Sequence, residues 1–224
     1  MKKKKRKKLK IKSVFIFLLF LAVLYFGFYS LSFIKPTTYI IKNNKYLSDE
    51  EVLKELQLDK DSSFLTICNI FKKDEVKKSK LIKSVDIKRN LDFEVIIDVK
   101  EYKMLYINKT NNKVVLENNE SIKYSNDNLP LLINKIDDKD IMKNFNKKMA
   151  KVNDDVINTI SEITYAPNGI DKERFLFSMN DGNYVYLTIT KLTKINNYKK
   201  IIDSVENKNG ILYLDYGNYF VPKE

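Results

Sequence analysis

The sequence predicts an α+β protein in three parts: a single N-terminal transmembrane helix, a β-α-α-β-β module, and a β-rich domain with a crossing helix. Three observations predict this order. A run of 22 uncharged residues, 13–34, is long enough to cross a bilayer. The next segment combines a helix-start signal with two strand patterns, and from residue 103 onward short strand patterns are separated by turn residues.

The uncharged run from Ser13 to Ile34 is bulky and apolar almost throughout. A helix of this length covers the roughly 30 Å hydrocarbon core of a membrane. A cleaved secretory signal has an apolar core of only about 7–15 residues before a small-residue cleavage site, and here only Ser30 and Ser32 suggest such a site. We therefore expect an uncleaved transmembrane helix over residues 13–34, with a cleaved signal as the alternative.

The twelve residues before the run carry nine positive charges and no negative charge. By the positive-inside rule, residues 1–12 form a basic cytoplasmic tail, and everything after the helix lies outside the membrane. The expected topology is single-pass, with the N-terminus cytoplasmic, the C-terminus extracytoplasmic and the cell membrane as a partner. The membrane-orienting residues are Lys2, Lys3, Lys4, Lys5, Arg6, Lys7, Lys8, Lys10 and Lys12.

This tail also explains the basic character of the chain. Subtracting its nine charges from the formal net charge of +12 leaves +3 for all the residues that follow. A nucleic-acid-binding domain is expected to carry a basic stripe with interleaved aromatic residues, and here the excess charge belongs to the tail. We expect no nucleic-acid partner.

Residues 36–102 predict a small α+β domain. Residues 39–42 predict a strand that ends in an asparagine turn, and Ser48 with Glu51 three residues later forms a capping-box pattern at a helix start. A short polar helix is predicted around residues 74–80. Apolar and polar residues then alternate over 93–99, which predicts a strand paired with a neighbouring one around Val85 and Ile87.

Residues 103–221 predict a β domain, followed by a short C-terminal tail at 222–224. Short strands and turns alternate with two helical patterns, and Asn180, Asp181 and Gly182 supply a hairpin turn. In chain order the predicted elements are a hairpin within 111–125, an extended piece at 129–134, a helical region over 137–163, a hairpin over 174–190, a helix from 191 ended by Gly210, and a last strand over 211–221.

The residue inventory argues against catalysis. The chain has no histidine, which excludes Ser-His-Asp and Cys-His nucleophile systems and histidine-containing zinc sites. A glycosidase needs two carboxylates across a cleft, whereas the acidic residues here are predicted on alternating strand faces and polar helices. We expect no catalytic, cofactor-binding or metal site, and hence no enzyme and no cofactor. The alternative is a membrane-anchored cell-wall hydrolase or transferase.

The order of these parts resembles the FtsQ/DivIB family of bacterial cell-division proteins, whose first extracytoplasmic module is a POTRA domain. The stretch "IIKNNKYLSDEEVLKEL" is similar to the family's strand, turn and helix start, and "IKSVDIKRNLDFEVIIDVKE" is similar to its hairpin ending in valine, one residue and glutamate. Later, "NDGNYVYL", "KLTKINNYKKII" and "GILYLDYGNYFVP" resemble its β domain. In one departure, Leu91 stands where a hairpin proline is common.

The resemblance implies a POTRA-like domain at 36–102 and a non-enzymatic scaffold of the division septum. It also implies that the C-terminal edge pairs with FtsL- and FtsB/DivIC-like proteins and helps control septal peptidoglycan synthesis, with the septal peptidoglycan synthase as a further partner. Strand addition at that edge would use the aromatic side chains that interfaces favour. In the competing interpretation, the aromatic residues there only complete the domain core. The expected partner-binding residues are Leu212, Tyr213, Leu214, Asp215, Tyr216, Tyr219, Phe220 and Val221.

Overall fold

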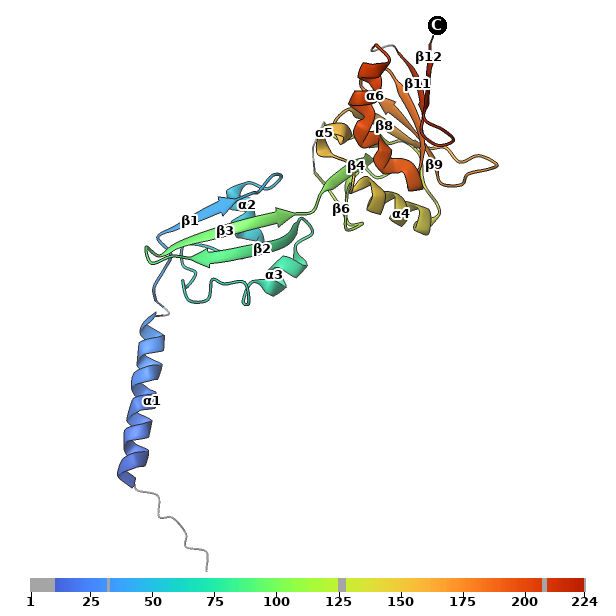
Figure 1. Ribbon diagram of the computed structural model, residues 1–224. Coiled ribbons are helices and arrows are strands. Elements are labelled where there is room, and N and C mark those ends of the chain that lie inside the picture. Colours follow the sequence, from blue (N-terminus) through green and yellow to red (C-terminus); the bar gives the residue numbers. More distant parts are fainter. Residues whose placement is uncertain (1–10, 32, 125–127, 207–208, 224) are drawn as a thin grey trace, which may run out of the picture. The chain divides into compact units, whose positions relative to one another are not determined.

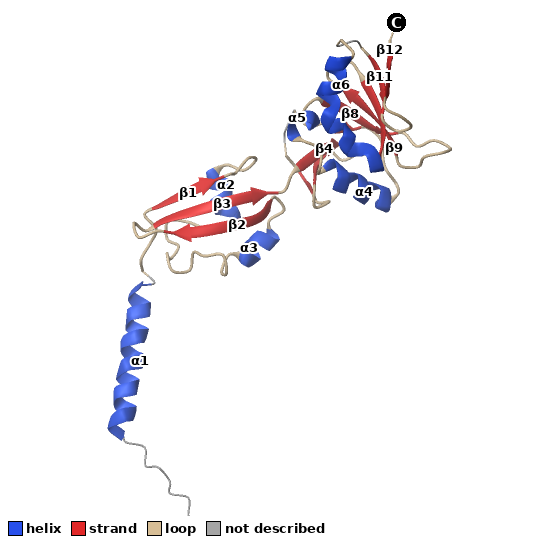
Figure 2. Ribbon diagram, in the orientation of Figure 1, coloured by secondary structure: helices blue, strands red, loops and turns tan. Residues whose placement is uncertain are grey.

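The computed structural model describes residues 11–31, 33–124, 128–206 and 209–223 of the chain (Figure 1). The chain divides into two compact units, Met1–Glu101 and Tyr102–Glu224. Helices and strands are mixed in both, which confirms the predicted α+β class (Figure 2).

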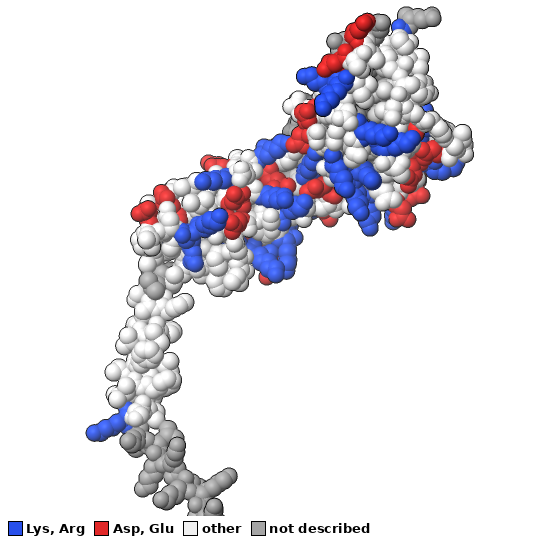
Figure 3. Space-filling view, viewed as in Figure 1, with Lys and Arg blue, Asp and Glu red and all other residues white. Residues whose placement is uncertain are grey.

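The first element is the apolar helix α1, Ile11–Leu31. At 1.5 Å per residue its 21 residues measure about 31 Å, close to the thickness of a bilayer core. Figure 3 shows it white except at its lower end, and Lys12 is the charged residue within it. Within the described residues it alone is long and apolar enough to span a membrane. The helix ends at Leu31 instead of residue 34, and Lys2 to Lys8 and Lys10 lie outside the described residues.

The rest of the first unit, which we call the N-terminal module, has the predicted strand-helix-helix-strand-strand order. Its three strands pair in the order β1-β3-β2, with β1 parallel and β2 antiparallel to β3. Its elements are β1 Thr38–Lys42, α2 Asp49–Glu55, α3 Lys73–Lys78, β2 Ile82–Arg89 and β3 Glu94–Glu101.

Local side-chain bonds hold the N-terminal module in register. Ser48 and Glu51 form the predicted capping box at the start of α2. At the end of β3, both carboxylate oxygens of Glu101 accept backbone N–H groups from residues 45–47, at 2.8–3.0 Å. This carboxylate therefore closes the loop between β1 and α2 onto the sheet, because N–H bonds to an ionised acceptor are strong. The core beneath is aliphatic and includes Val52, Leu56 and Ile97.

The second unit is built on a nine-stranded sheet in the order β12-β11-β10-β9-β8-β7-β4-β5-β6. Helices α4 and α6 lie against it in Figure 2, and Phe145 of α4 stacks on Phe175 of β9 with ring centroids 4.2 Å apart. The strands are β4 Met104–Asn108, β5 Lys113–Leu116, β6 Ser121–Ile122, β7 Leu131–Leu132, β8 Ile160–Tyr165, β9 Arg174–Met179, β10 Tyr184–Thr188, β11 Gly210–Tyr213 and β12 Tyr219–Pro222. The helices are α4 Lys139–Met149, α5 Asp154–Ile157, η1 Ile189–Asn197 and α6 Tyr198–Ser204.

Three predicted elements of this unit are wrong in detail. Residues 160–163 belong to β8 instead of a helix, because a bulge between Ile160 and Glu162 breaks the strand's two-residue period. The crossing helix ends at Ser204, and Gly210 is the first residue of β11. Residues 211–221 form two strands, because the segment between β11 and β12 turns the chain back into an antiparallel hairpin.

Candidate partner-binding surface

The C-terminal hairpin forms one edge of the nine-stranded sheet. β12 pairs antiparallel with β11, and no described strand pairs with its other side. The N–H of Lys223 donates to the carbonyl of Asn209 at 2.8 Å. Because bonded and non-bonded residues alternate along an antiparallel pair, the N–H and C=O of Phe220 point away from β11. This free edge offers a donor and an acceptor at Phe220 and an acceptor at Pro222, which has no N–H.

A row of tyrosines, which we call the tyrosine row, crosses the last three strands on one face of the sheet. Tyr186 of β10 stacks on Tyr213 of β11 with ring centroids 5.4 Å apart, and Tyr213 stacks on Tyr219 of β12 at 4.8 Å. The guanidinium carbon of Arg174 on β9 lies 3.7 Å from the centroid of Tyr186. Cross-strand aromatic pairs and a cation over a ring each stabilise such a surface, so the row links the edge strand to the sheet interior.

Asp215, in the turn after β11, holds the guanidinium of Arg174 in place beside Tyr186. Its carboxylate accepts a hydrogen bond from Nε of Arg174 at 2.7 Å, with side chains 2% and 16% exposed. The other carboxylate oxygen accepts the N–H of Tyr216 at 2.9 Å, and the ammonium of Lys191 donates to the Asp215 carbonyl. These bonds join Asp215 to β9, to η1 and to its own turn, so they constrain the path of the hairpin turn.

The eight expected partner-binding residues therefore fall into two groups. Leu212, Leu214 and Asp215 are buried and take part in holding the hairpin in place. The accessible group comprises Tyr213 and Phe220, which are half-buried, and Tyr216, Tyr219 and Val221, which are 57%, 50% and 44% exposed. Only the accessible group can contact a partner without rearrangement of the fold.

Sequence reasoning missed Arg174, Tyr184 and Tyr186, which lie on neighbouring strands of the same face. The ammonium of Lys223 lies over the ring of Tyr184, 4.3 Å from the ring centroid. The alternating tyrosines of the stretch "NYVYL" were the available signal, since residues two apart on a strand share a face.

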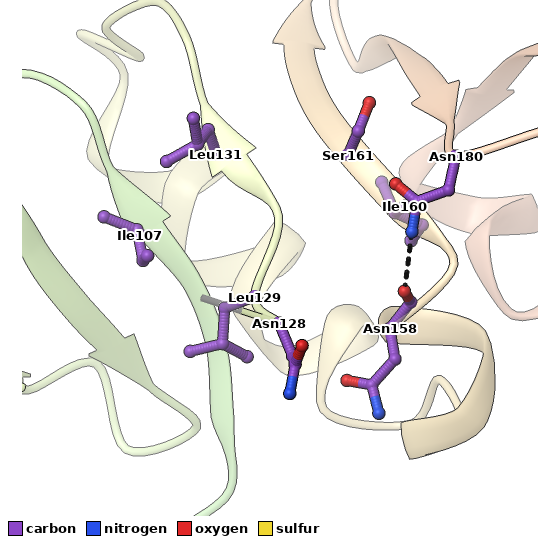
Figure 4. A pocket seen from close by; sticks show the side chains of 8 residues that line it. All are labelled: Ile107, Asn128, Leu129, Leu131, Asn158, Ile160, Ser161 and Asn180. Atoms are coloured by element: carbon purple, nitrogen blue, oxygen red, sulfur yellow. Dashed lines mark hydrogen bonds between the residues drawn. The ribbon is translucent and has the colours of Figure 1, made fainter. Parts of the chain in front are cut away.

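Hollows elsewhere in the second unit offer little acid–base chemistry. One has a volume of about 350 Å³ and lies between β4, β7 and the start of β8 (Figure 4). Asn180 Nδ2 donates to the Asn158 carbonyl across one wall at 2.9 Å. None of the described residues that line it is ionisable: they are Ile107, Asn128, Leu129, Leu131, Asn158, Ile160, Ser161 and Asn180.

A second hollow of about 450 Å³ lies between α4 and strands β4 to β6. Tyr106 donates to Asn146 at 2.7 Å there, and Asn146 donates in turn to Asn119 at 2.9 Å. Burial raises the pKa of Tyr106, so its hydroxyl stays protonated and acts as a donor. The ionisable groups among its described lining residues are Tyr106 and two lysines, with no carboxylate pair.

The chain is similar in sequence to several known proteins. Residues 37–102 match the POTRA domain of FtsQ type. The cell division protein DivIB of Bacillus anthracis is 28% identical over 227 residues, which cover 97% of this chain and 85% of that protein. DivIB of Bacillus subtilis (strain 168) is 27% identical over 209 residues, covering 90% and 79%. These matches align the chain, over nearly its whole length, with DivIB/FtsQ-type cell division proteins.

These matches confirm the resemblance read from the sequence, and the match over residues 37–102 identifies the N-terminal module as a POTRA domain. A solved structure is also similar: the major extracytoplasmic domain of the trans isomer of DivIB from Geobacillus stearothermophilus, at 23% identity and a TM-score of 0.39. The match covers 48% of this chain and 97% of that one.

Proposed function

We propose that this chain is a non-enzymatic scaffold of the division septum. It is anchored by α1 with its N-terminus in the cytoplasm, and it binds FtsL- and FtsB/DivIC-type proteins outside the membrane and helps control septal peptidoglycan synthesis. The similarity to DivIB cell division proteins and the one long apolar helix among the described residues support this placement. The mixed charges over both units in Figure 3 suit protein partners better than nucleic acid.

The observation that carries the proposal is the free edge of β12 beside the tyrosine row. An added strand would bond to the outward N–H and C=O of Phe220. Its side chains on one face would lie over Tyr219 and Val221, which are half exposed. On the other face they would meet a hollow of about 410 Å³ lined by Phe220 and Pro222 together with the end of α6. Backbone bonds would give affinity and these two surfaces would give specificity.

The alternative of a cell-wall hydrolase or transferase finds less support. Retaining and inverting glycosidases both need two carboxyl groups facing the scissile bond. The two hollows of the second unit described above are lined by amides, hydroxyls, apolar groups and lysines in the part of the chain that the structure describes. Those side chains can bind a polar ligand but do not provide the acid and base pair.

The test separates the backbone bond from the side chain at the edge. Phe220→Pro removes both the outward N–H and the ring, whereas Phe220→Ala removes the ring alone. Ser121→Pro is a matched control, because β6 is the opposite edge of the same sheet and the Leu116–Glu120 bond places the Ser121 N–H outward by the same alternation. The full chain in lipid nanodiscs is titrated with the extracytoplasmic parts of the FtsL- and FtsB/DivIC-type partners.

We expect Phe220→Pro to weaken binding roughly fivefold or more beyond Phe220→Ala, which corresponds to about one lost hydrogen bond. Tyr219→Lys should also weaken binding, because it places a charge in the tyrosine row. Ser121→Pro should bind like the unaltered chain. Equal affinities for the proline and alanine variants at 220 would refute strand addition, and binding unaffected by any change in β12 would refute the site.

A further inference from the structure

The POTRA domain exposes large apolar side chains at the turn between β2 and β3. Leu91 is 96% exposed and Phe93 is 43% exposed, and we call these two residues the apolar tip. The turn is fixed, because Asn90 Oδ1 accepts the N–H groups of Asp92 and Glu94 at 3.1 and 2.9 Å. Phe93 is also held at a φ of +60°, a costly conformation for an aromatic residue. The turn thus presents two apolar side chains from a rigid backbone.

Hydrogen bonds tie this turn to the chain just after the transmembrane helix. The N–H of Thr37 donates to the Phe93 carbonyl at 2.8 Å, and its hydroxyl donates to the Asp92 carbonyl at 3.1 Å. Phe64, whose ring centroid lies 5.4 Å from that of Phe93, donates its N–H to the Ile34 carbonyl at 2.8 Å. The neighbourhood of the apolar tip is therefore bonded to residues that follow α1 directly.

The short connection keeps the apolar tip close to the end of α1. Helix α1 ends at Leu31, and the three residues to Ile34 extend at most about 10 Å. The uncharged run continues through Phe33, which is 65% exposed, and the first charge after α1 is Lys35. Aromatic residues at such a position lie at headgroup level. Ile34 is then at the interface, and Phe64 and Phe93 are held close to it.

The charges around the apolar tip nearly cancel. The tip therefore suits apolar contact with the lipid better than attraction to charged headgroups. The charged residues of the turn and of the segments bonded to it include Lys35, Lys88, Arg89, Asp61, Asp92 and Glu94. Lys35 pairs with Asp61, and Arg89 is occupied by the carbonyls of Phe64 and Leu65 at 3.0 and 3.1 Å. Electrostatic attraction to anionic headgroups is therefore weak here, and Leu91 and Phe93 provide the contact.

We propose that the β2–β3 turn of the POTRA domain inserts into the lipid surface from which α1 emerges, with Leu91 and Phe93 at the boundary between headgroups and acyl chains. Asp92, exposed between them, keeps the insertion shallow. The turn is a second attachment beside α1, and it limits rotation of the POTRA domain on its short tether. The inference rests on the proposed anchoring of α1 and goes beyond the proposed scaffold role.

The absence of tryptophan from the sequence gives a direct test. Single-tryptophan variants Leu91→Trp and Phe93→Trp of the full chain are placed in phosphatidylcholine nanodiscs, with and without bromine on the acyl chains. Ile170→Trp is the matched control, since Ile170 is 82% exposed in a turn of the second unit. Phe20→Trp in the middle of α1 reports the anchoring itself.

We expect a blue-shifted emission and a loss of fluorescence in brominated lipid for Leu91→Trp and Phe93→Trp, and neither change for Ile170→Trp. Added phosphatidylglycerol should leave this loss unchanged. Quenching of Phe20→Trp without quenching of either tip variant would refute insertion and leave the anchoring intact. An unquenched Phe20→Trp would refute the anchoring on which the proposal rests. Quenching of the tip only with phosphatidylglycerol would refute the apolar contact in favour of charge attraction.

Discussion

The POTRA domain and the second unit bury and expose different kinds of side chain. The POTRA core is wholly aliphatic among its fully buried residues, and the domain exposes Leu91 and Phe93. The second unit buries aromatic rings together with Asn146 and Asp215, and it exposes tyrosines at its edge. Leucine and phenylalanine need no hydrogen-bond partner, which suits lipid, whereas tyrosine combines apolar area with a hydroxyl and suits a protein interface. The surfaces therefore differ in the partner they fit.

Removing the buried carboxylate of Asp215 should have the largest effect on the stability of the second unit. Asp215→Ala leaves the guanidinium of Arg174 buried without its partner, which costs about 3–5 kcal/mol of folding free energy. Asp137→Ala is the matched control in the same unit, since its bond to Lys135 at 2.5 Å joins exposed side chains and contributes little to stability. Urea unfolding of the second unit measures the difference. A loss for Asp215→Ala no larger than for Asp137→Ala would contradict the anchoring role.

The contact of Gly210 with β12 should give the next effect. A Cβ atom at Gly210 would lie 2.5 Å from Cζ of Phe220 and would also meet the Val221 carbonyl. Gly210→Ala must displace the edge strand, at a cost of about 1–3 kcal/mol. At Gly169 no atom lies within 4 Å of such a Cβ, so Gly169→Ala should be neutral. Faster amide exchange in β11 and β12 for Gly210→Ala alone is the expected result, and equal exchange in the two variants would refute it.

A substitution at Glu101 should loosen the POTRA domain without affecting the second unit. Glu101→Gln replaces one acceptor oxygen by an amide group that faces backbone N–H donors, which should cost roughly 1–3 kcal/mol. Exchange should accelerate in residues 45–47 and leave β11 and β12 unchanged, because Glu101 lies in the other unit. Glu50→Gln, at an exposed position of α2, is the control. Acceleration in both units would show that they do not unfold separately.

The POTRA order was predictable because its signals are local. The capping box at Ser48 and the alternation over β3 each lie within a few residues. In β8 the bulge spaces the buried residues Ile160 and Ile163 three apart, which imitates a helix. The stacking of Tyr186 on Tyr213 could not be predicted, because β10 and β11 are parallel and meet only after η1 and α6 have crossed between them. The pairing of Arg174 with Asp215 has the same origin, since 41 positions separate them in the chain.

The smallest expected effect is an alkaline weakening of the second unit. Burial, and then the hydrogen bond to Asp181, raise the pKa of Tyr198 above its ordinary value of 10.0. A raised folded-state pKa means that the unfolded chain loses this proton first, so the stability is complete below about pH 10 and falls above it. Burial also raises the pKa of Tyr106.

Thermal unfolding of the full chain between about pH 8 and 11 measures this effect. The transition of the second unit should shift down above pH 10, and Tyr198→Phe should reduce the slope while lowering stability near neutral pH through the lost bond to Asp181. Tyr216→Phe, at an exposed position, should leave the slope unchanged. In the POTRA domain burial raises the pKa of Tyr39, whereas in the second unit it raises the pKa of both Tyr106 and Tyr198, so the POTRA transition should shift less. Equal shifts in the two units would mean that buried tyrosines do not distinguish them.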